Sequence, residues 1–250
     1  MIKGLPSLST LIGLKVNGRP TIGRCVACLD SNAFNGLCAP CRQELPVNRY
    51  GCRRCGLPLP ESAMPRLCGE CILDPPSFVR ARIPWQYRFP VDGMIGRYKY
   101  RGDRKFGRPL IEDFARFLEQ DLREEPSPAT CALVPAPMHP GRRRQRGFNH
   151  ADDIAEGLAK HLILPIHAGL IRRARRTTPQ RALTRTQRLD NLREVFEVCG
   201  TPPSDIAIVD DVVTTGATAR VMAANLLEAG ARHVEIWALA RTPGQGQHEG

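Results

Sequence analysis

The 250-residue sequence lacks any long hydrophobic run. No stretch approaches the roughly 18 apolar residues that a membrane-spanning helix needs, so the sequence predicts no transmembrane segment. The apolar segment at residues 8–14 is too short and too poorly flanked to be the hydrophobic part of a signal peptide. We therefore expect a cytoplasmic protein, with the inner face of the membrane as an alternative location.

Acidic residues are scarce relative to basic ones. The chain has 25 Asp and Glu against 36 Lys and Arg, which gives a formal net charge of +11. This balance suggests a phosphate-rich partner, either nucleic acid or an anionic membrane surface, although many basic proteins have no such partner. The length and the hydrophobic content of 42% are enough for one sizeable core plus a small appendage.

Eight of the ten cysteines form four C-x-x-C pairs within residues 25–71. Each pair can aim two thiolates at one tetrahedral point, and two pairs complete a closed four-thiolate zinc site. Pairing in sequence order gives two structural zinc sites, and a crossed pairing is the alternative. The expected ligands are Cys25, Cys28, Cys38 and Cys41 for one site and Cys52, Cys55, Cys68 and Cys71 for the other.

A disulfide framework would need an oxidising compartment, which nothing else in the sequence supports. Residues 25–75 carry few large apolar side chains, so we expect zinc to supply most of the stability of this zinc ribbon domain. Cys131 and Cys199 fall outside the pattern and are interpreted as small buried hydrophobic residues.

The most informative stretch runs from residue 205 to residue 218. Residues 206–209 form an apolar run without polar alternation, which is typical of a parallel strand covered on both faces. Asp210 and Asp211 follow at its carboxyl end, and a small, hydroxyl-rich loop then opens a helix, where backbone N–H groups can bind an anion. The loop consists of Thr214, Thr215, Gly216, Ala217 and Thr218.

Two adjacent carboxylates can accept hydrogen bonds from vicinal hydroxyls or hold a magnesium ion, and the loop beyond them can hold a phosphate. A phosphorylated ribose meets both demands. This stretch resembles the phosphoribosyl pyrophosphate (PRPP) signature of the type I phosphoribosyltransferases. In that family the acids address the ribose hydroxyls and the loop takes the 5′-phosphate, which implies these roles for Asp210, Asp211 and residues 214–218. Another α/β fold with an acidic pocket, such as a phosphoacceptor receiver or a hydrolase, is the alternative. A receiver would need a third acid at the end of a separate strand and a lysine on a later strand, and neither is well placed in this sequence.

The resemblance implies an α/β fold with a parallel sheet flanked by helices at residues 76–241. The apolar spacing predicts helices over residues 110–122, after a basic turn at residues 98–103, and from the N-cap Asn149. Residues 131–134 are expected to form the first core strand and residues 233–240 another. We interpret residues 72–90 as a link, residues 1–24 as a flexible lead and residues 242–250 as a disordered tail.

Arginine dominates residues 142–193, which carry 12 Arg and one Lys against four acids. By resemblance, the segment after the first strand (Ala136 and Pro137) and a flexible loop bind pyrophosphate. The loop residues to test are Arg175, Arg176, Gln180 and Arg188. The basic run Arg142, Arg143, Arg144 and Arg146 is expected to bind single-stranded DNA, with a solvated basic face as the alternative.

Several motifs occur together in this sequence: the cysteine pairs, the segments at residues 98–100, 134–137, 146–149 and 178–191, and the acid-pair motif. In this combination the sequence resembles the ComF (ComFC) family. Its members are bacterial proteins linked to natural transformation and are thought to help take single-stranded DNA inward. The resemblance implies PRPP with magnesium, single-stranded DNA, and a DNA-uptake helicase or translocation machinery as partners.

Two alternatives to DNA handling stay open: a phosphoribosyltransferase acting on an unidentified small acceptor, and a regulator that senses PRPP and binds duplex DNA. Purine-salvage enzymes carry an acid at the position of Thr214 as general base, and threonine cannot serve that way, so no catalytic residue is assigned. A glutamine-using amidotransferase needs an N-terminal nucleophilic cysteine, whereas here Met1 is followed by Ile2.

Overall fold

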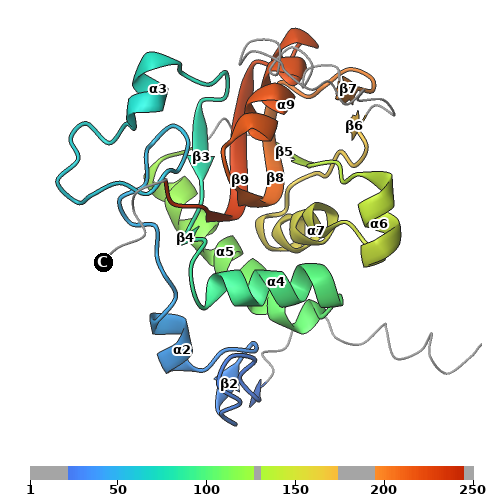
Figure 1. The fold of residues 1–250 in the computed structure, drawn as a ribbon. Coiled ribbons are helices and arrows are strands. Elements are labelled where there is room, and N and C mark those ends of the chain that lie inside the picture. The colour runs from blue at the N-terminus through green and yellow to red at the C-terminus, as the bar shows by residue number, and fades with distance from the viewer. Residues whose placement is uncertain (1–21, 127–130, 174–194, 245–250) are drawn as a thin grey trace, which may run out of the picture.

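The computed structural model describes residues 22–126, 131–173 and 195–244. Its centre is a parallel sheet of five strands in the order β3-β9-β8-β5, with β4 also paired to β9 (Figure 1). The strands are β3 (Arg80–Arg82), β4 (Trp85–Gln86), β5 (Cys131–Pro135), β8 (Asp205–Val213) and β9 (His233–Arg241). The predicted α/β fold with a parallel sheet is confirmed.

Helices cover both faces of this sheet. They are α4 (Val91–Arg101), α5 (Arg104–Glu124), α7 (His150–Leu162) and α9 (Ala217–Glu228). A further helix, α6 (Pro140–Arg146), contributes no buried residue. Ala207 and Val209 of β8 share a core with α4, α5 and α7, whereas Ile206 and Ile208 share a second core with α9. Because successive side chains of a strand point to opposite faces, both faces of β8 are apolar, and this explains the unbroken apolar run.

Helix α7 begins where the sequence predicts. The side chain of the N-cap Asn149 accepts a hydrogen bond from the N–H of Ala151. Its amide also donates to Asp152 Oδ1 at 3.0 Å and to the carbonyl oxygen of Ala136 at 3.1 Å. The cap therefore ties the start of α7 to the segment that follows β5.

Three expectations about local structure are wrong. Residues 80–86 are not a simple link, because β3 and β4 both pair with β9, and β5 is therefore not the first strand of the sheet along the chain. Residues 98–101 are not a turn but the last turn of α4, which ends at Gly102 with a φ of 66°. Cys199 is not a buried residue but only a partly buried one. The side chain of Cys131 lies outside the described part, so the interpretation of that cysteine stays a prediction.

The cysteine-rich part forms two small units, which we call the first ribbon (residues 25–41) and the second ribbon (residues 52–74). The first contains β2 (Ala33–Phe34), which pairs with β1 (Ile22–Gly23), and leads into α2 (Ala39–Gln43). The second ends in α3 (Gly69–Leu73). Figure 1 shows the two ribbons at opposite ends of the molecule, with α2 and β2 beside α4 and α5 and with α3 toward the α9 end.

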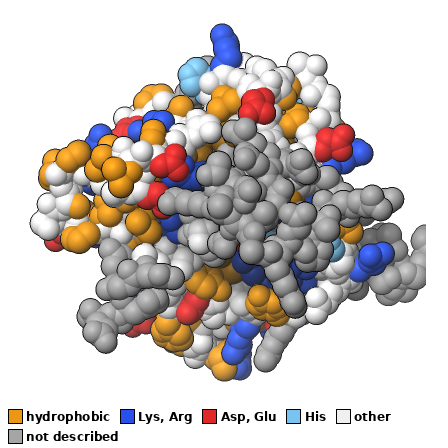
Figure 2. Space-filling view, turned by 45° about the horizontal axis from the view of Figure 1, so that its top comes forward, with side chains coloured by type: hydrophobic (Ala, Val, Ile, Leu, Met, Phe, Trp, Pro, Cys, Tyr) orange, Lys and Arg blue, Asp and Glu red, His pale blue; other side chains and the backbone are white. Residues whose placement is uncertain are grey.

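Hydrophobic side chains also gather on the surface of the second ribbon. Met64, Ile72 and Leu73 are exposed there, and orange side chains cluster at the left of the face that Figure 2 presents.

Among the described helices, none combines the length and apolar character that crossing a bilayer requires.

Two short antiparallel strands, β6 (Ile171–Arg173) and β7 (Phe196–Val198), form a small sheet separate from the central parallel sheet. The predicted pyrophosphate-loop residues Arg175, Arg176, Gln180 and Arg188 lie outside the described residues, as do residues 1–21 and 245–250.

Candidate functional site

The acid pair lies within the last four residues of the strand β8, which is longer than predicted. Strand pairing with β9 continues past Asp210, which is opposite Ala238, to Val213, which is opposite Arg241. The carboxylate of Asp210 accepts a hydrogen bond from the N–H of Asp211 at 2.8 Å. Burial, followed by the neighbouring Asp211 carboxylate, raises the pKa of Asp210 to about 7. The pair therefore resists carrying two negative charges unless a cation is close.

Lys99 supplies such a cation. Its Nζ lies 2.8 Å from Asp211 Oδ1, with side-chain exposures of 15% and 13%. Lys99 belongs to α4, and the neighbouring Tyr98 fixes that helix because its fully buried ring packs beside α7 and its hydroxyl donates to Asp153 Oδ2 at 2.7 Å. The last turn of α4 is thereby held over the end of β8.

A pocket of about 250 Å³ opens above the acid pair. It brings together the ends of β5, α6, α7, β6 and β8, which are far apart in sequence. Its lining residues include Lys99, Tyr100, Ala136, Pro137, Arg142, Arg146, Asn149, Arg173, Asp210, Asp211 and Thr218. Four of these side chains are basic and two are acidic, so the pocket carries a positive balance that suits a polyanionic ligand.

The basic side chains of the pocket crowd one another. Burial, and then the charge of Arg142, lowers the pKa of Arg173. Within the described residues neither arginine has a carboxylate partner. Arg146 instead lies over the ring of Tyr100, with its guanidinium carbon 4.7 Å from the ring centroid. Cations held together without counter-ions favour the binding of an anion between them.

The phosphate loop, residues 214–218, is a tight turn into α9. Gly216 has a φ of 80° and caps the helix, and the N–H of Ala217 points to Thr215 Oγ1 at 3.4 Å. Thr218 reaches the pocket, whereas Thr214 and Thr215 are exposed beside it. The helix start and the acid pair are thus separated by one short turn.

The structure distributes the predicted arginines over two pockets. Arg142 and Arg146 line the pocket above the acid pair. Arg143 lines an adjacent pocket of about 480 Å³ that shares Pro137 and Asn149 with the first, and Arg144 is exposed. All four lie on α6, a helix that the sequence did not indicate because its run of arginines has no apolar face.

Two residues that line the pocket, Lys99 and Arg173, were not predicted from the sequence. Lys99 was expected only as part of a basic turn at residues 98–103, because its ion pair with Asp211 joins segments 112 residues apart and leaves no local signal. Arg173 was not among the expected site residues, although it ends β6 and lines the pocket.

The eight paired cysteines form two clusters in sequence order, so crossed pairing is excluded. In each cluster the four Sγ atoms lie within 4.8 Å of one another. Cys28 and Cys38 have their Sγ atoms 3.6 Å apart, as do Cys55 and Cys68. Zn–S bonds of about 2.3 Å in a tetrahedron place sulfurs about 3.8 Å apart, whereas a disulfide needs about 2.0 Å. The donor set and its spacing fit structural zinc.

Backbone N–H groups point at the sulfurs and favour the thiolate form. The N–H groups of Cys68 and Cys71 lie 3.3 and 3.4 Å from the Sγ atoms of Cys52 and Cys68. Hydrogen bonding from Cys55, opposed by burial, lowers the pKa of Cys52 to about 4. The pKa shifts the other way for Cys55, where the hydrogen bond with Cys52 and then burial raise it, and for Cys71, where burial raises it to about 12. One sulfur of this cluster is therefore favoured as a thiolate, and zinc binds cysteine in that form.

Comparisons with known proteins agree with this architecture. The model of the double zinc ribbon domain family matches residues 20–72. Competence protein F of Haemophilus influenzae is 31% identical over 231 residues, which cover 87% of this chain and 96% of that protein. The chain belongs to the ComF family. Its resemblance to that family, inferred above from short motifs, is thereby confirmed over most of its length.

Other ComF relatives cover the chain to a similar extent. DNA utilization protein YhgH of Escherichia coli K12 is 29% identical and covers 83% of this chain and 91% of that protein. Competence protein ComFC of Bacillus subtilis is 29% identical over 82% of this chain and 84% of that protein. A hypoxanthine phosphoribosyltransferase from Staphylococcus aureus aligns over 56% of this chain and 68% of that one, at 11% identity and a TM-score of 0.37.

Proposed function

We propose that this ComF-family chain binds PRPP in the pocket above Asp210 and Asp211 and handles single-stranded DNA in DNA uptake and use. The observation that carries the first part is the convergence of independently predicted segments on one pocket. The acid pair, the segment after β5 and the basic helix α6 all line it.

Each part of PRPP can be assigned to one group of residues around the pocket. In this proposal the carboxylates of Asp210 and Asp211 accept hydrogen bonds from the ribose hydroxyls. The 5′-phosphate lies at the start of α9, where N–H groups of the phosphate loop are free of helical partners. The pyrophosphate lies against Ala136 and Pro137, where Arg142 and Arg173 add positive charge.

Magnesium fits the donors that are present. It prefers oxygen ligands and is commonly held by one or two carboxylates together with substrate phosphates. Asp210 and Asp211 offer carboxylate oxygens at the pocket, and the Asp210 carboxylate accepts a hydrogen bond from the N–H of Asp211. These two residues would hold the ion, which when bound would neutralise the pyrophosphate.

The DNA part of the proposal rests on the relatives and on α6. Relatives that match over most of the chain are named for competence and for DNA utilization. Arg142, Arg143 and Arg144 are exposed on α6, and Arg146 of the same helix lies over the ring of the exposed Tyr100. Arginines that contact phosphates and an aromatic ring on which a base can stack are the usual components of single-strand binding.

Calorimetric titration with ligand fragments tests the pocket. Ribose 5-phosphate, magnesium pyrophosphate and PRPP with magnesium are titrated separately into the zinc-loaded chain. We expect PRPP to bind more tightly than either fragment because it occupies both anion positions at once. Equal affinity for pyrophosphate and PRPP would show that no ribose phosphate site operates at the acid pair and the phosphate loop.

Salt dependence tests the DNA part. Binding of a short single-stranded oligonucleotide should weaken steeply with salt, and R142A/R143A/R144A should reduce both the affinity and the salt slope. The matched control is R116A/R123A, which removes exposed arginines from α5 instead. If the α6 variant keeps wild-type affinity, the strand binds elsewhere.

A further inference from the structure

Two arginines connect the second ribbon to the two ends of the phosphate loop. The first is Arg241, at the end of β9, which is buried with an exposure of 5%. Its Nε donates to the carbonyl oxygen of Cys55 at 3.2 Å, and its Nη1 donates to the carbonyl oxygens of Val213 and Thr214. One guanidinium therefore holds a zinc-ligand residue and the backbone that enters the loop.

The second is Arg220, in the first turn of α9. Its Nη2 donates to the carbonyl oxygen of Asp74 at 2.8 Å, and its guanidinium lies 3.5 Å from the Asp74 carboxylate and 3.6 Å from the Glu70 carboxylate. Glu70 belongs to α3, which also carries the zinc ligand Cys71. The backbone that leaves the phosphate loop is thus also tied to the second ribbon.

The second ribbon has only a small core, which is built around its metal site. Its core consists of Cys52, Cys68 and Cys71, with Cys55, Leu57 and Leu59 packed beside them. Helix α3 has five residues, too few to be stable alone. The anchor of Arg241 is the carbonyl of the ligand residue Cys55, and the anchors of Arg220 lie on and directly after α3, which carries the ligand Cys71, so we expect both to depend on the metal site.

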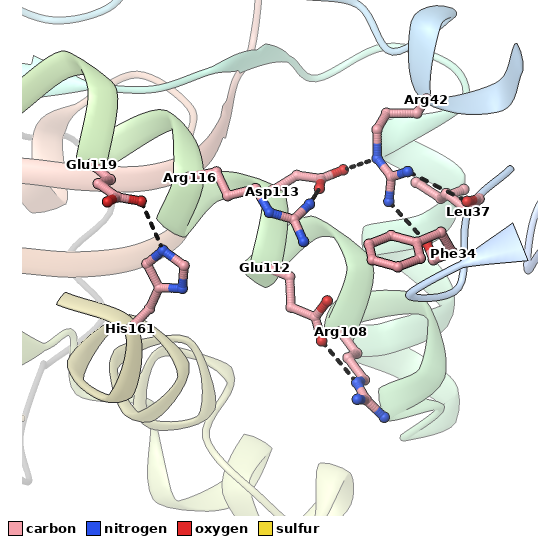
Figure 3. Close-up of polar contacts among 9 residues, drawn as sticks. All are labelled: Phe34, Leu37, Arg42, Arg108, Glu112, Asp113, Arg116, Glu119 and His161. Atoms are coloured by element: carbon pink, nitrogen blue, oxygen red, sulfur yellow. Dashed lines mark hydrogen bonds and ion pairs between the residues drawn. The ribbon is translucent and has the colours of Figure 1, made fainter. Parts of the chain in front are cut away.

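Within the part of the chain that the structure describes, the polar contacts of the first ribbon lead to α5 instead. Figure 3 shows Arg42 between the two parts that it joins: it donates to Asp113 Oδ2 of α5 at 2.6 Å and to the carbonyl oxygens of Phe34 and Leu37. Cys25 and Cys38 belong to the core that contains α5. The first ribbon is therefore attached to the opposite part of the molecule.

We propose that Arg241 and Arg220 are positioning residues through which the zinc site of the second ribbon holds the phosphate loop. Occupation of this site then sets the affinity for the 5′-phosphate, whereas the first ribbon does not influence it. This inference rests on the proposed PRPP site and adds a dependence on one of the two metals.

The test compares the same replacement in the two ribbons. R220Q removes the tie of the second ribbon to α9, and R42Q removes the tie of the first ribbon to α5. PRPP affinity is measured by calorimetry, and amide hydrogen exchange is followed at residues 213–220. We expect R220Q to weaken PRPP binding by about tenfold and to speed exchange in this segment. R42Q should change neither.

Two further variants separate positioning from folding. R220K retains a charge that can pair with Asp74 and Glu70, so it should recover much of the affinity that R220Q loses. C71S should release one of two zinc ions per chain, weaken PRPP binding and speed amide exchange at residues 213–220. Amide exchange in β5 should stay at the wild-type rate, which would show that the sheet is folded.

The inference is overturned if C71S loses its zinc while exchange at residues 213–220 stays at the wild-type rate, or if R42Q and R220Q have equal effects. The exchange measurement needs no ligand. If the wild-type chain does not bind PRPP, the proposed function fails, and the coupling between zinc and the loop is still decided by exchange.

Discussion

Lys99 Nζ lies 2.8 Å from Asp211 Oδ1, and both side chains are largely buried. The lysine comes from α4, outside the strand-loop-helix unit that carries the acids. It gives the acid pair a resident positive charge, which offsets part of the repulsion between Asp210 and Asp211. It also adds to the positive balance of the pocket, so one side chain favours both the ionised acids and an anionic ligand.

Replacing Lys99 by Met should therefore weaken PRPP binding. The variant leaves the two carboxylates without their cation and removes a positive charge from the pocket, so we expect a loss of about 10-fold to 100-fold in affinity, or roughly 1.4–2.8 kcal/mol. Titration calorimetry measures it. Lys160→Met, an exposed position on α7, is the control. Equal affinity of both variants would remove Lys99 from the site.

The packing of Gly107 against Tyr98 gives a test of how α4 is held. A Cβ at Gly107 would lie 2.7 Å from Cδ2 of the Tyr98 ring, which is fully buried and cannot move aside. We expect Gly107→Ala to destabilise the protein by about 1–3 kcal/mol through overpacking. Urea unfolding of the variant and the wild type measures this difference.

Gly96→Ala is the matched control for that experiment. Gly96 lies inside α4, and nothing lies within 4 Å of a Cβ added there. Because alanine is the better helix former, this change should stabilise the protein by up to about 1 kcal/mol. Stabilisation by both replacements would show that the Tyr98 ring does not fix α4 against α5.

His150 gives the protein a pH dependence of known sign. Its ring is fully buried beside Tyr98 and Phe148, and neither ring nitrogen has a hydrogen-bond partner in the described structure. Burial lowers the pKa of His150; the Asp211 charge opposes this shift, and the charges of Arg146 and Lys99 add to it.

The unfolded chain therefore binds a proton at His150 more tightly than the folded chain does. The contribution to stability is complete above the unfolded pKa of about 6.5 and is lost as the pH falls below that value. Urea unfolding at a series of pH values should show this slope in the wild type and a smaller one in His150→Phe. His167→Gln, at an exposed site, controls for the loss of an imidazole. An unchanged slope in His150→Phe would contradict the assignment.

Features with local signals could be predicted from the sequence. The zinc ligands repeat at a spacing of three, and the N-cap Asn149 lies at the start of its own helix. The buried strand was found because both of its faces are apolar, although its end was placed too early. Pairing with β9 carries β8 through the two polar acids to Val213, and polar residues in a strand look like a loop.

Features that depend on distant partners could not be predicted. β3 and β4 are three and two residues long, and they are strands only because β9 lies beside them. Helix α4 contains two glycines and has little apolar periodicity, so its last turn was taken for a basic turn. Lys99 meets Asp211 only once that helix is packed, and therefore the central ion pair of the pocket left no trace in the local sequence.

The most direct test of the account is a calorimetric titration of the zinc-loaded chain with PRPP and magnesium, beside the double variant Asp210→Asn and Asp211→Asn. The replacements keep the size of both side chains and remove the charges that would hold the ribose and the ion. We predict saturable binding to the wild type and a loss of at least about tenfold in the variant, with unchanged zinc content. Equal binding to both proteins, or no binding to the wild type, would contradict a PRPP site at the end of β8.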